Sequence, residues 1–174
     1  YVDHPSFGVP LLGRWLVGHG YRVGIVAQPR WKDEGQGIAD LARMGRPRLF
    51  AGVSAGALDS MLAHYTAFRK KRHDDAYTPG GKAGFRPDYA VKVYTQILKR
   101  LFPHVPVVVG GIEASLRRLT HYDYWNDTLK PSVLAESGAD LLIYGMGERV
   151  VQQVARAMRC LLYTSDAADD LTRV

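Results

Sequence analysis

The sequence predicts an α/β fold built on a doubly wound parallel sheet, and two stretches carry that prediction. Residues 107–109 are a β-branched run that ends on Gly110 and Gly111, after which a helical pattern begins. Residues 139–144 form a second short apolar run, which ends at the glycines of 145–147 before another helical pattern. Open α/β sheets bind ligands at the edge where parallel strands deliver their carboxyl ends to loops and helices. The two glycine-ended crossings therefore predict both the architecture and the position of a site.

The first predicted elements alternate between helix and strand. Residues 7–19 carry apolar side chains at helical spacing, and Gly20 is typical of a helix end. Residues 21–27 have the β-branched pattern of a strand. A short helix at 38–44 then leads to a second strand at 48–54.

The middle of the chain is predicted to contain helices on either side of a long loop. A helix is predicted at 58–71, followed by an irregular polar segment at 72–87. Pattern-free segments of about this length are uncommon in compact domains and are usually functional or mobile. Residues 91–101 have amphipathic helical spacing and lead to the strand at 105–109, while the last strand is predicted at 140–144.

The composition indicates one globular domain with a basic surface. The chain has 174 residues, of which 47% are hydrophobic and 23% are charged, which is enough to bury a core. The formal net charge of +6 attracts anionic partners such as nucleic acid or phosphorylated ligands, with a solvated basic surface as the simpler explanation. No apolar stretch approaches the roughly 18 residues of a membrane helix, and no leader opens the chain, so we expect a cytoplasmic location and no membrane partner.

A single cysteine limits the cofactor chemistry of this chain. Cys160 is the only cysteine, so no internal disulfide can form, and one thiolate cannot supply the three that hold a cluster with an open iron. No second histidine stands at helical ligand spacing from His121. We therefore expect no iron–sulfur cluster, no metal site and no catalytic residue here.

Three motifs carry a resemblance to a known family. They are DHPSFG at 3–8, DDAYTPGGKAG at 74–84 and SLRRLTHYDYW at 115–125. In this order and spacing they resemble the N-terminal region of the YgiQ-like radical SAM proteins. The glycine-ended crossings also resemble the closing half of the cobalamin-binding-type Rossmann domain that precedes the barrel of many radical SAM enzymes. The resemblance runs from Tyr1 to about Met158.

The resemblance implies a Rossmann-like sheet of the flavodoxin or cobalamin-binding type, whose first strand precedes Tyr1 and is missing from this chain. In the flavodoxin order that strand is central, between the strands at 21–27 and 48–54. The resemblance further implies a downstream radical SAM barrel as partner, which binds a 4Fe–4S cluster and S-adenosylmethionine and acts on an unknown substrate. This chain is then a non-catalytic accessory domain that covers or shapes the substrate site.

The last residues are set apart from the fold prediction. The segment CLLYTSDAADD at 160–170 resembles the translation of a transposon adapter used in sequencing libraries, so 160–174 is interpreted as a non-native tail. Without the tail, 22 basic and 14 acidic residues give a net charge of +8. We expect residues 1–159 to form the accessory domain, truncated at both ends, and the tail not to pack on it.

The candidate site residues follow the predicted strands or lie in the motifs. Gly110 and Gly111 either let a ligand approach the backbone or form a tight turn, and Glu148 either faces a ligand or complements a helix dipole. Asp3 and His4 resemble the Asp-x-His-x-x-Gly loop in which histidine ligates cobalt in cobalamin proteins, but the histidine stands one position too early. The alternative to cobalt ligation is that the two residues form a hydrogen bond within the loop or at a helix N-terminus. The candidates for facing a substrate or cofactor are Asp3, His4, Ser54, Gly110, Gly111, Glu113, His121, Tyr122, Asp123, Gly145, Gly147 and Glu148.

Two groups of side chains leave alternatives open. The aromatic run at 121–125 either packs against the barrel or contacts substrate. A basic group is the candidate for binding an anionic substrate: Arg69, Lys70, Lys71, Arg72, Lys82, Arg117 and Arg118. The alternative functions are a cobalamin- or nucleotide-binding module, which needs an open cleft above Gly110 and Gly111, and an RNA-binding domain, which needs the basic group on one continuous face.

Overall fold

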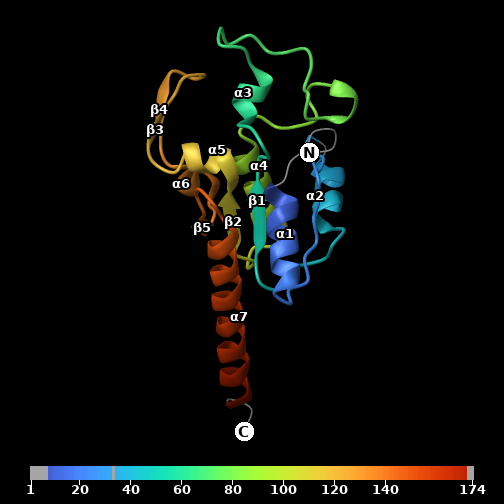
Figure 1. Ribbon diagram of the computed structural model, residues 1–174, viewed down its shortest axis with the longest axis vertical. Helices are drawn as coiled ribbons and strands as arrows, with labels where there is room; N and C mark the ends of the chain where they lie inside the picture. The colour runs from blue at the N-terminus through green and yellow to red at the C-terminus, as the bar shows by residue number, and fades with distance from the viewer. Residues whose placement is uncertain (1–7, 33, 172–174) are drawn as a thin grey trace.

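The computed structural model describes residues 8–32 and 34–171, and a parallel sheet lies at its centre (Figure 1). The strands are β1 (Ala51–Ser54), β2 (Val107–Gly110) and β5 (Leu141–Leu142), in the spatial order β1-β2-β5. Val53 pairs with Val109, which pairs with Leu142 on its other side. The predicted α/β class with a parallel sheet is confirmed, and the sheet is consistent with a Rossmann-like fold.

Helices precede, connect and follow the strands. Those in the described residues are α1 (Gly8–Gly18), α2 (Glu34–Ala42), α3 (Ser60–His64), α4 (Ala90–Leu101), α5 (Gly111–Leu116), α6 (Val133–Ser137) and α7 (Glu148–Leu171), with a 3-10 turn at Pro79–Gly81. None of the helices in the described residues is long and apolar enough to cross a lipid bilayer.

The helices cover both faces of the sheet. α4 packs on the face that carries Val53 and Val109. α1 and α7 pack together on the other face, where Leu16 and Ala155 meet Phe50 and Ile143. Because side chains alternate along a strand, Phe50 and Val53 point to opposite faces, which makes the arrangement doubly wound.

α4 is the amphipathic helix that the sequence predicts at 91–101. Val91, Tyr94 and Leu98 recur at helical spacing and are buried, whereas Arg100 is exposed. The apolar face of the helix lies against the valines of β2, so the two most strongly patterned segments of the chain form the centre of the core.

The strand predicted at 21–27 is wrong. The segment has no regular secondary structure and no strand partner among the described residues, and Val23 and Ile25 remain more than a third exposed. A β-branched pattern becomes a strand only when a neighbour takes up its backbone hydrogen bonds. The neighbour implied by the resemblance is a central strand between this segment and β1, and the described residues contain none.

The helix predicted at 58–71 is wrong beyond its first turns. Only α3 is helical, after which Tyr65 forms an antiparallel bridge with Lys71. Asp59 begins α3 by accepting backbone N–H groups of its first turn. The helix ends at His64. The His64 ring and the Tyr65 hydroxyl both hydrogen-bond to Asp88. Those contacts come from a distant part of the chain, so local periodicity does not show them.

An antiparallel hairpin lies near the carboxyl edge of the sheet (Figure 1). It consists of β3 (His121–Asp123) and β4 (Thr128–Lys130), and neither strand is predicted from the sequence. At the opposite end of the molecule α7 extends away from the sheet (Figure 1). The helix continues through the segment interpreted as a tail, in which Cys160 and Leu161 are exposed.

Candidate functional site

The carboxyl ends of β1 and β2 meet at one edge of the sheet, where Gly110 and Gly111 form a tight turn. Gly111 has a φ of +83°, and a Cβ at this position would lie 2.5 Å from the Ser54 Oγ. That oxygen accepts a hydrogen bond from the Gly56 N–H at 3.0 Å. A Cβ at Gly110 would lie 3.3 Å from the Ile143 carbonyl oxygen. The space beside the glycine pair is thus filled by protein atoms, which favours the tight-turn interpretation over a ligand cradle.

Glu113 follows the glycine pair and points into the protein. Its side chain is 1% exposed. One carboxylate oxygen accepts from the Ser60 N–H at 2.8 Å and the other from the Val91 N–H at 2.9 Å. These contacts do not support the prediction that Glu113 faces a ligand, because both oxygens join the starts of α3 and α4 to the edge of the sheet.

Arg117 is also held within the fold. Its guanidinium pairs with the Asp59 carboxylate through both Nη1 and Nη2, the Nη2–Oδ1 distance being 3.1 Å. Burial lowers the pKa of Arg117, while the charges of Asp123 and Glu136 act in the opposite direction. The prediction that Arg117 binds an anion is not supported, because its guanidinium already has a carboxylate partner.

A second buried carboxylate fixes the β3–β4 hairpin to the start of α4. Asp123 is 4% exposed and accepts from the Tyr89 hydroxyl at 2.5 Å. Lys130 Nζ lies 2.5 Å from the same Asp123 oxygen and 3.9 Å from the centroid of the Tyr89 ring. Asn126 donates to the Tyr89 hydroxyl at 2.7 Å. These contacts also hold Tyr89 at a φ of 52°, a left-handed conformation that is costly for a residue with a Cβ.

The electrostatics of this cluster favour fixed protonation states. Burial acts to raise the pKa of Asp123, but hydrogen bonds from Lys130, Tyr89, Asn126 and the Trp125 N–H outweigh it and hold that pKa well below its usual range. Burial and the neighbouring Asp123 raise the pKa of Tyr89 far above its usual value. Since neither group exchanges a proton near neutral pH, the arrangement suits structural support rather than acid–base catalysis.

Large apolar and aromatic side chains are exposed around this edge. The exposed fraction reaches 76% for Leu129 and 82% for Met146. They come from the segment after α3, from α5 and the turn after it, from the hairpin and from the turn after β5: Phe68, Leu116, Leu119, Tyr122, Tyr124, Leu129, Tyr144 and Met146. We call these eight residues the apolar edge. Figure 1 shows α3, α5 and the hairpin at the same end of the sheet. Large apolar side chains exposed at one end of a sheet are typical of interaction surfaces.

The other predicted residues of the hairpin and the β5 turn have local roles. His121 Nδ1 lies 3.2 Å from the Leu119 carbonyl oxygen, and the Tyr122 hydroxyl donates to Asp127. Gly145 has a φ of +70° in the turn after β5, and Gly147 precedes α7, with ordinary packing contacts around it. Glu148 occupies the first turn of α7, where a carboxylate complements the helix dipole. Asp3 and His4 lie outside the described residues.

The predicted basic group is divided among different environments. Arg69 covers the Tyr124 ring at 4.4 Å, and Arg118 covers the Tyr144 ring at 5.4 Å while donating to the Ser115 carbonyl. Lys71 and Arg72 line a small cavity that Lys70 and Lys82 do not line. The continuous basic face required for an RNA-binding domain is therefore not supported.

The open cleft required by a cobalamin- or nucleotide-binding module is not supported either. Neither the cavity beside His64 nor the shallow hollow beside Lys99 and Gly138 is lined by Gly110 or Gly111. The described residues also contain no group of three or more His, Cys, Asp and Glu side chains arranged to hold a metal ion.

Several residues that organise this region do not appear among the sequence-based candidates. Asp59, Tyr89 and Lys130 hold the edge and the hairpin, and Asp75 and Arg86 form a buried pair in the segment between α3 and α4. The only signal for the last pair is the dense DDAYTPGGKAG motif, which contains Asp75 and precedes Arg86. The other three carry no local pattern that distinguishes them from surface residues.

Comparison with known proteins identifies the family. The family model described as "Radical SAM N-terminal" matches residues 1–170. The chain is 59% identical over 158 residues to a UPF0313 protein of Thermotoga neapolitana, and 61% identical over 158 residues to one of Porphyromonas gingivalis. Each match covers 91% of this chain but only 27% and 24% of the respective relative. No solved structure gives a significant match. The chain belongs to the radical SAM N-terminal family.

Proposed function

We propose that this chain is the N-terminal accessory domain of a YgiQ-like radical SAM enzyme and that it performs no radical chemistry itself. The family match supports the first half of the proposal. The chain spans about a quarter of the length of the relatives named above, so most of such a protein lies outside it. The motifs DHPSFG, DDAYTPGGKAG and SLRRLTHYDYW support the finer assignment.

The residues of this chain do not fit the cofactor that a radical SAM enzyme uses. A 4Fe–4S cluster that leaves one iron open for S-adenosylmethionine needs three thiolates. This chain contains one cysteine, Cys160, which is exposed on α7. We therefore assign the cluster and S-adenosylmethionine to the part of the full-length protein outside this chain.

The exposed apolar edge is the observation that carries the proposed role. Its side chains project from a hairpin and turns that the ion pairs of Asp123 and Arg117 hold rigid. Such a preorganised surface loses little conformational entropy when it binds a partner. We propose that this edge packs against the cluster-bearing barrel and covers its substrate site. The substrate is unknown, and the net charge of +6 favours an anionic one.

Hydrogen exchange on the full-length protein tests this docking. Leu129→Ser removes an exposed side chain of the edge, and Val17→Ser is the matched control, because Val17 is 56% exposed on α1 away from the edge. We expect the Leu129→Ser variant to exchange faster than wild type at the hairpin amides of 121–130 and the control to match wild type. Equal exchange at 121–130 in both variants and the wild type would mean that the edge does not dock.

A further inference from the structure

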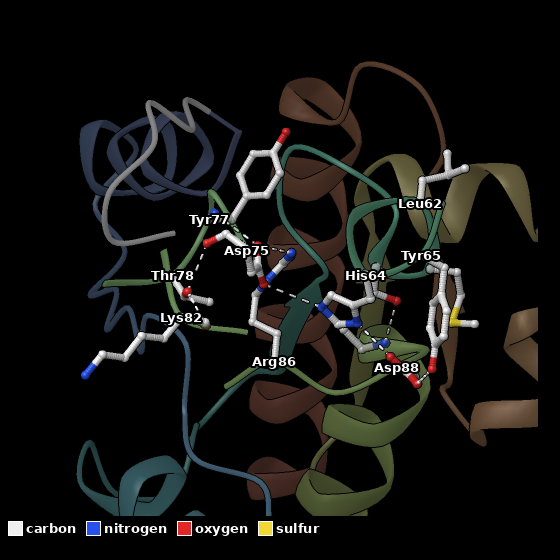
Figure 2. A network of polar contacts seen from close by, with 12 residues as sticks. Leu62, His64, Tyr65, Asp75, Tyr77, Thr78, Lys82, Arg86 and Asp88 are labelled. Atoms are coloured by element: carbon white, nitrogen blue, oxygen red, sulfur yellow. Dashed lines mark hydrogen bonds and ion pairs between the residues drawn. The ribbon is translucent and has the colours of Figure 1, made fainter. Parts of the chain in front are cut away.

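The segment between α3 and α4 is folded around one buried carboxylate, that of Asp75 (Figure 2). Arg86 donates to it twice, from Nε to Oδ2 at 2.8 Å and from Nη2 to Oδ1 at 2.9 Å. The Tyr77 N–H donates to Oδ1 at 3.0 Å. The buried Thr78 hydroxyl lies 3.0 Å from the Asp75 carbonyl oxygen and 2.6 Å from that of Lys82. This network fixes irregular backbone, so side chains projecting from the segment have defined positions.

A cavity of about 70 Å³ lies beside this network. One water needs only about 10–15 Å³, so the cavity has room for a polyatomic ligand. Its lining brings together four cationic side chains from separate parts of the chain: Lys32, Lys71, Arg72 and Arg86. Lys82, by contrast, points away from the cluster around His64 (Figure 2).

Two carboxylates also line the cavity, and one of them is already engaged. Asp88 contacts His64 Nδ1 at 2.6 Å and accepts from the Tyr65 hydroxyl at 2.8 Å. The hydrogen bond from His64 is the largest cause of a pKa of Asp88 below its usual value. Asp74 is exposed. Since Arg86 is already paired with Asp75, the remaining lining charges are those of Lys32, Lys71 and Arg72 against the two carboxylates, which leaves an excess of one positive charge.

Buried donors of the lining residues lack partners. Arg86 Nη1 and Trp31 Nε1 have no hydrogen-bond partner among the described residues, although the Arg86 side chain is only 5% exposed. His64 is not one of these donors, because its Nδ1 contacts Asp88 and its Nε2 lies 3.6 Å from Asp75 Oδ2. A buried donor without an acceptor destabilises the fold, and proteins rarely leave two such donors together. These donors indicate an acceptor-rich ligand.

We propose that this cavity binds a phosphate group, either as free phosphate or as part of a small phosphorylated molecule. A phosphate monoester presents three strong acceptor oxygens and nearly two negative charges at neutral pH. The two unpartnered donors and the cations of Lys32, Lys71 and Arg72 match that group better than they match a carboxylate, which has two oxygens and one charge. The inference does not depend on the proposed radical SAM role, because it rests only on the contacts around the cavity.

Titration calorimetry on the full-length protein tests the site with inorganic phosphate, glycerol 3-phosphate and acetate at constant ionic strength. Lys71→Gln and Arg72→Gln each remove one lining cation, and both residues are exposed enough to change without unfolding the segment. Lys70→Gln is the matched control, since Lys70 is the exposed neighbour that does not line the cavity. Thermal unfolding of each variant verifies that the fold is kept.

The expected result is saturable binding of at least one phosphate probe and weaker binding of acetate. Lys71→Gln and Arg72→Gln should each weaken phosphate binding by about tenfold, as for loss of a charge-assisted contact, while Lys70→Gln changes it less than about twofold. Tighter binding of glycerol 3-phosphate than of inorganic phosphate identifies the ligand as a phosphorylated molecule, and the reverse identifies free phosphate. Absence of saturation with both phosphate probes, or an equal loss in the Lys70→Gln control, would overturn the proposal.

Discussion

Single buried residues at the carboxyl edge hold backbone in place instead of facing a ligand. The carboxylate of Glu113 accepts from two helix starts, and that of Asp59 holds Arg117. Ser54 fills the space beside Gly111. A polar residue at the end of a parallel strand is therefore not enough to predict a binding role, because the same edge must also satisfy the orphan N–H groups of the helices that follow.

Gly111 is the residue whose substitution should be most damaging at this edge. Gly111→Ala places a Cβ at a φ of +83°, within 2.5 Å of the Ser54 Oγ. We expect a loss of about 2–4 kcal/mol in the free energy of unfolding, from left-handed strain plus the clash. Chemical denaturation measures it. In a Ser54→Ala background the loss should fall by roughly half, since only the strain remains. An unchanged loss in that background would show that the clash contributes nothing.

The Asp123 cluster predicts a defined pH dependence. Because hydrogen bonds hold the pKa of Asp123 below its usual value, its ionised form stabilises the fold above the unfolded-state pKa of about 4, and this contribution is lost as the pH falls further. Asp123→Asn should lower the free energy of unfolding by about 2 kcal/mol at pH 7. The difference in this free energy between variant and wild type should shrink as the pH falls from about 4 to about 2. Unfolding experiments across that range measure it, and a difference that stays constant down to pH 2 would contradict the cluster described here.

At the scale of elements, hydrophobic patterns correctly predicted those helices and strands that depend on contacts between neighbouring elements. The valines of β2 and the apolar face of α4 form the core as predicted, because both patterns act on neighbouring elements of the sheet. The strand expected at 21–27 has no neighbouring strand among the described residues, and the long helix expected at 58–71 is ended by contacts with Asp88, which lies far along the chain. The same holds for the site: Asp59 and Arg117 are 58 residues apart, and Tyr89 and Asp123 are 34 apart. Periodicity contains no signal for such pairs.

The outer part of α7 should contribute little to stability. Val151 and Ala155 pack against α1, whereas Cys160 and Leu161 are exposed. Ending the chain at Arg159 should therefore leave the melting temperature nearly unchanged in a thermal scan. A drop of more than about 2–4 °C, equivalent to roughly 1 kcal/mol in a domain of this size, would mean that residues 160–174 pack on the fold.

At the scale of the whole molecule, the sheet, the apolar edge and the family match support the proposal that catalysis and covering of the substrate site belong to different domains of the full-length protein. The doubly wound sheet holds the hairpin and turns rigid, and the edge exposes apolar side chains that a free-standing domain would bury. The matched part of this chain covers 27% and 24% of the two relatives named above. On the proposal made above, the chemistry belongs to the remaining part of such a protein and the covering role to this domain.

The most direct test of that proposal is anaerobic reconstitution with iron and sulfide, applied in parallel to this chain and to the full-length protein that contains it. Iron and sulfide content and the visible absorbance of the cluster are the measurements. We expect the full-length protein to take up a 4Fe–4S cluster and to bind S-adenosylmethionine, and this chain to do neither, because its single cysteine cannot supply three thiolates. Stoichiometric iron and sulfide on this chain as a monomer would contradict the account.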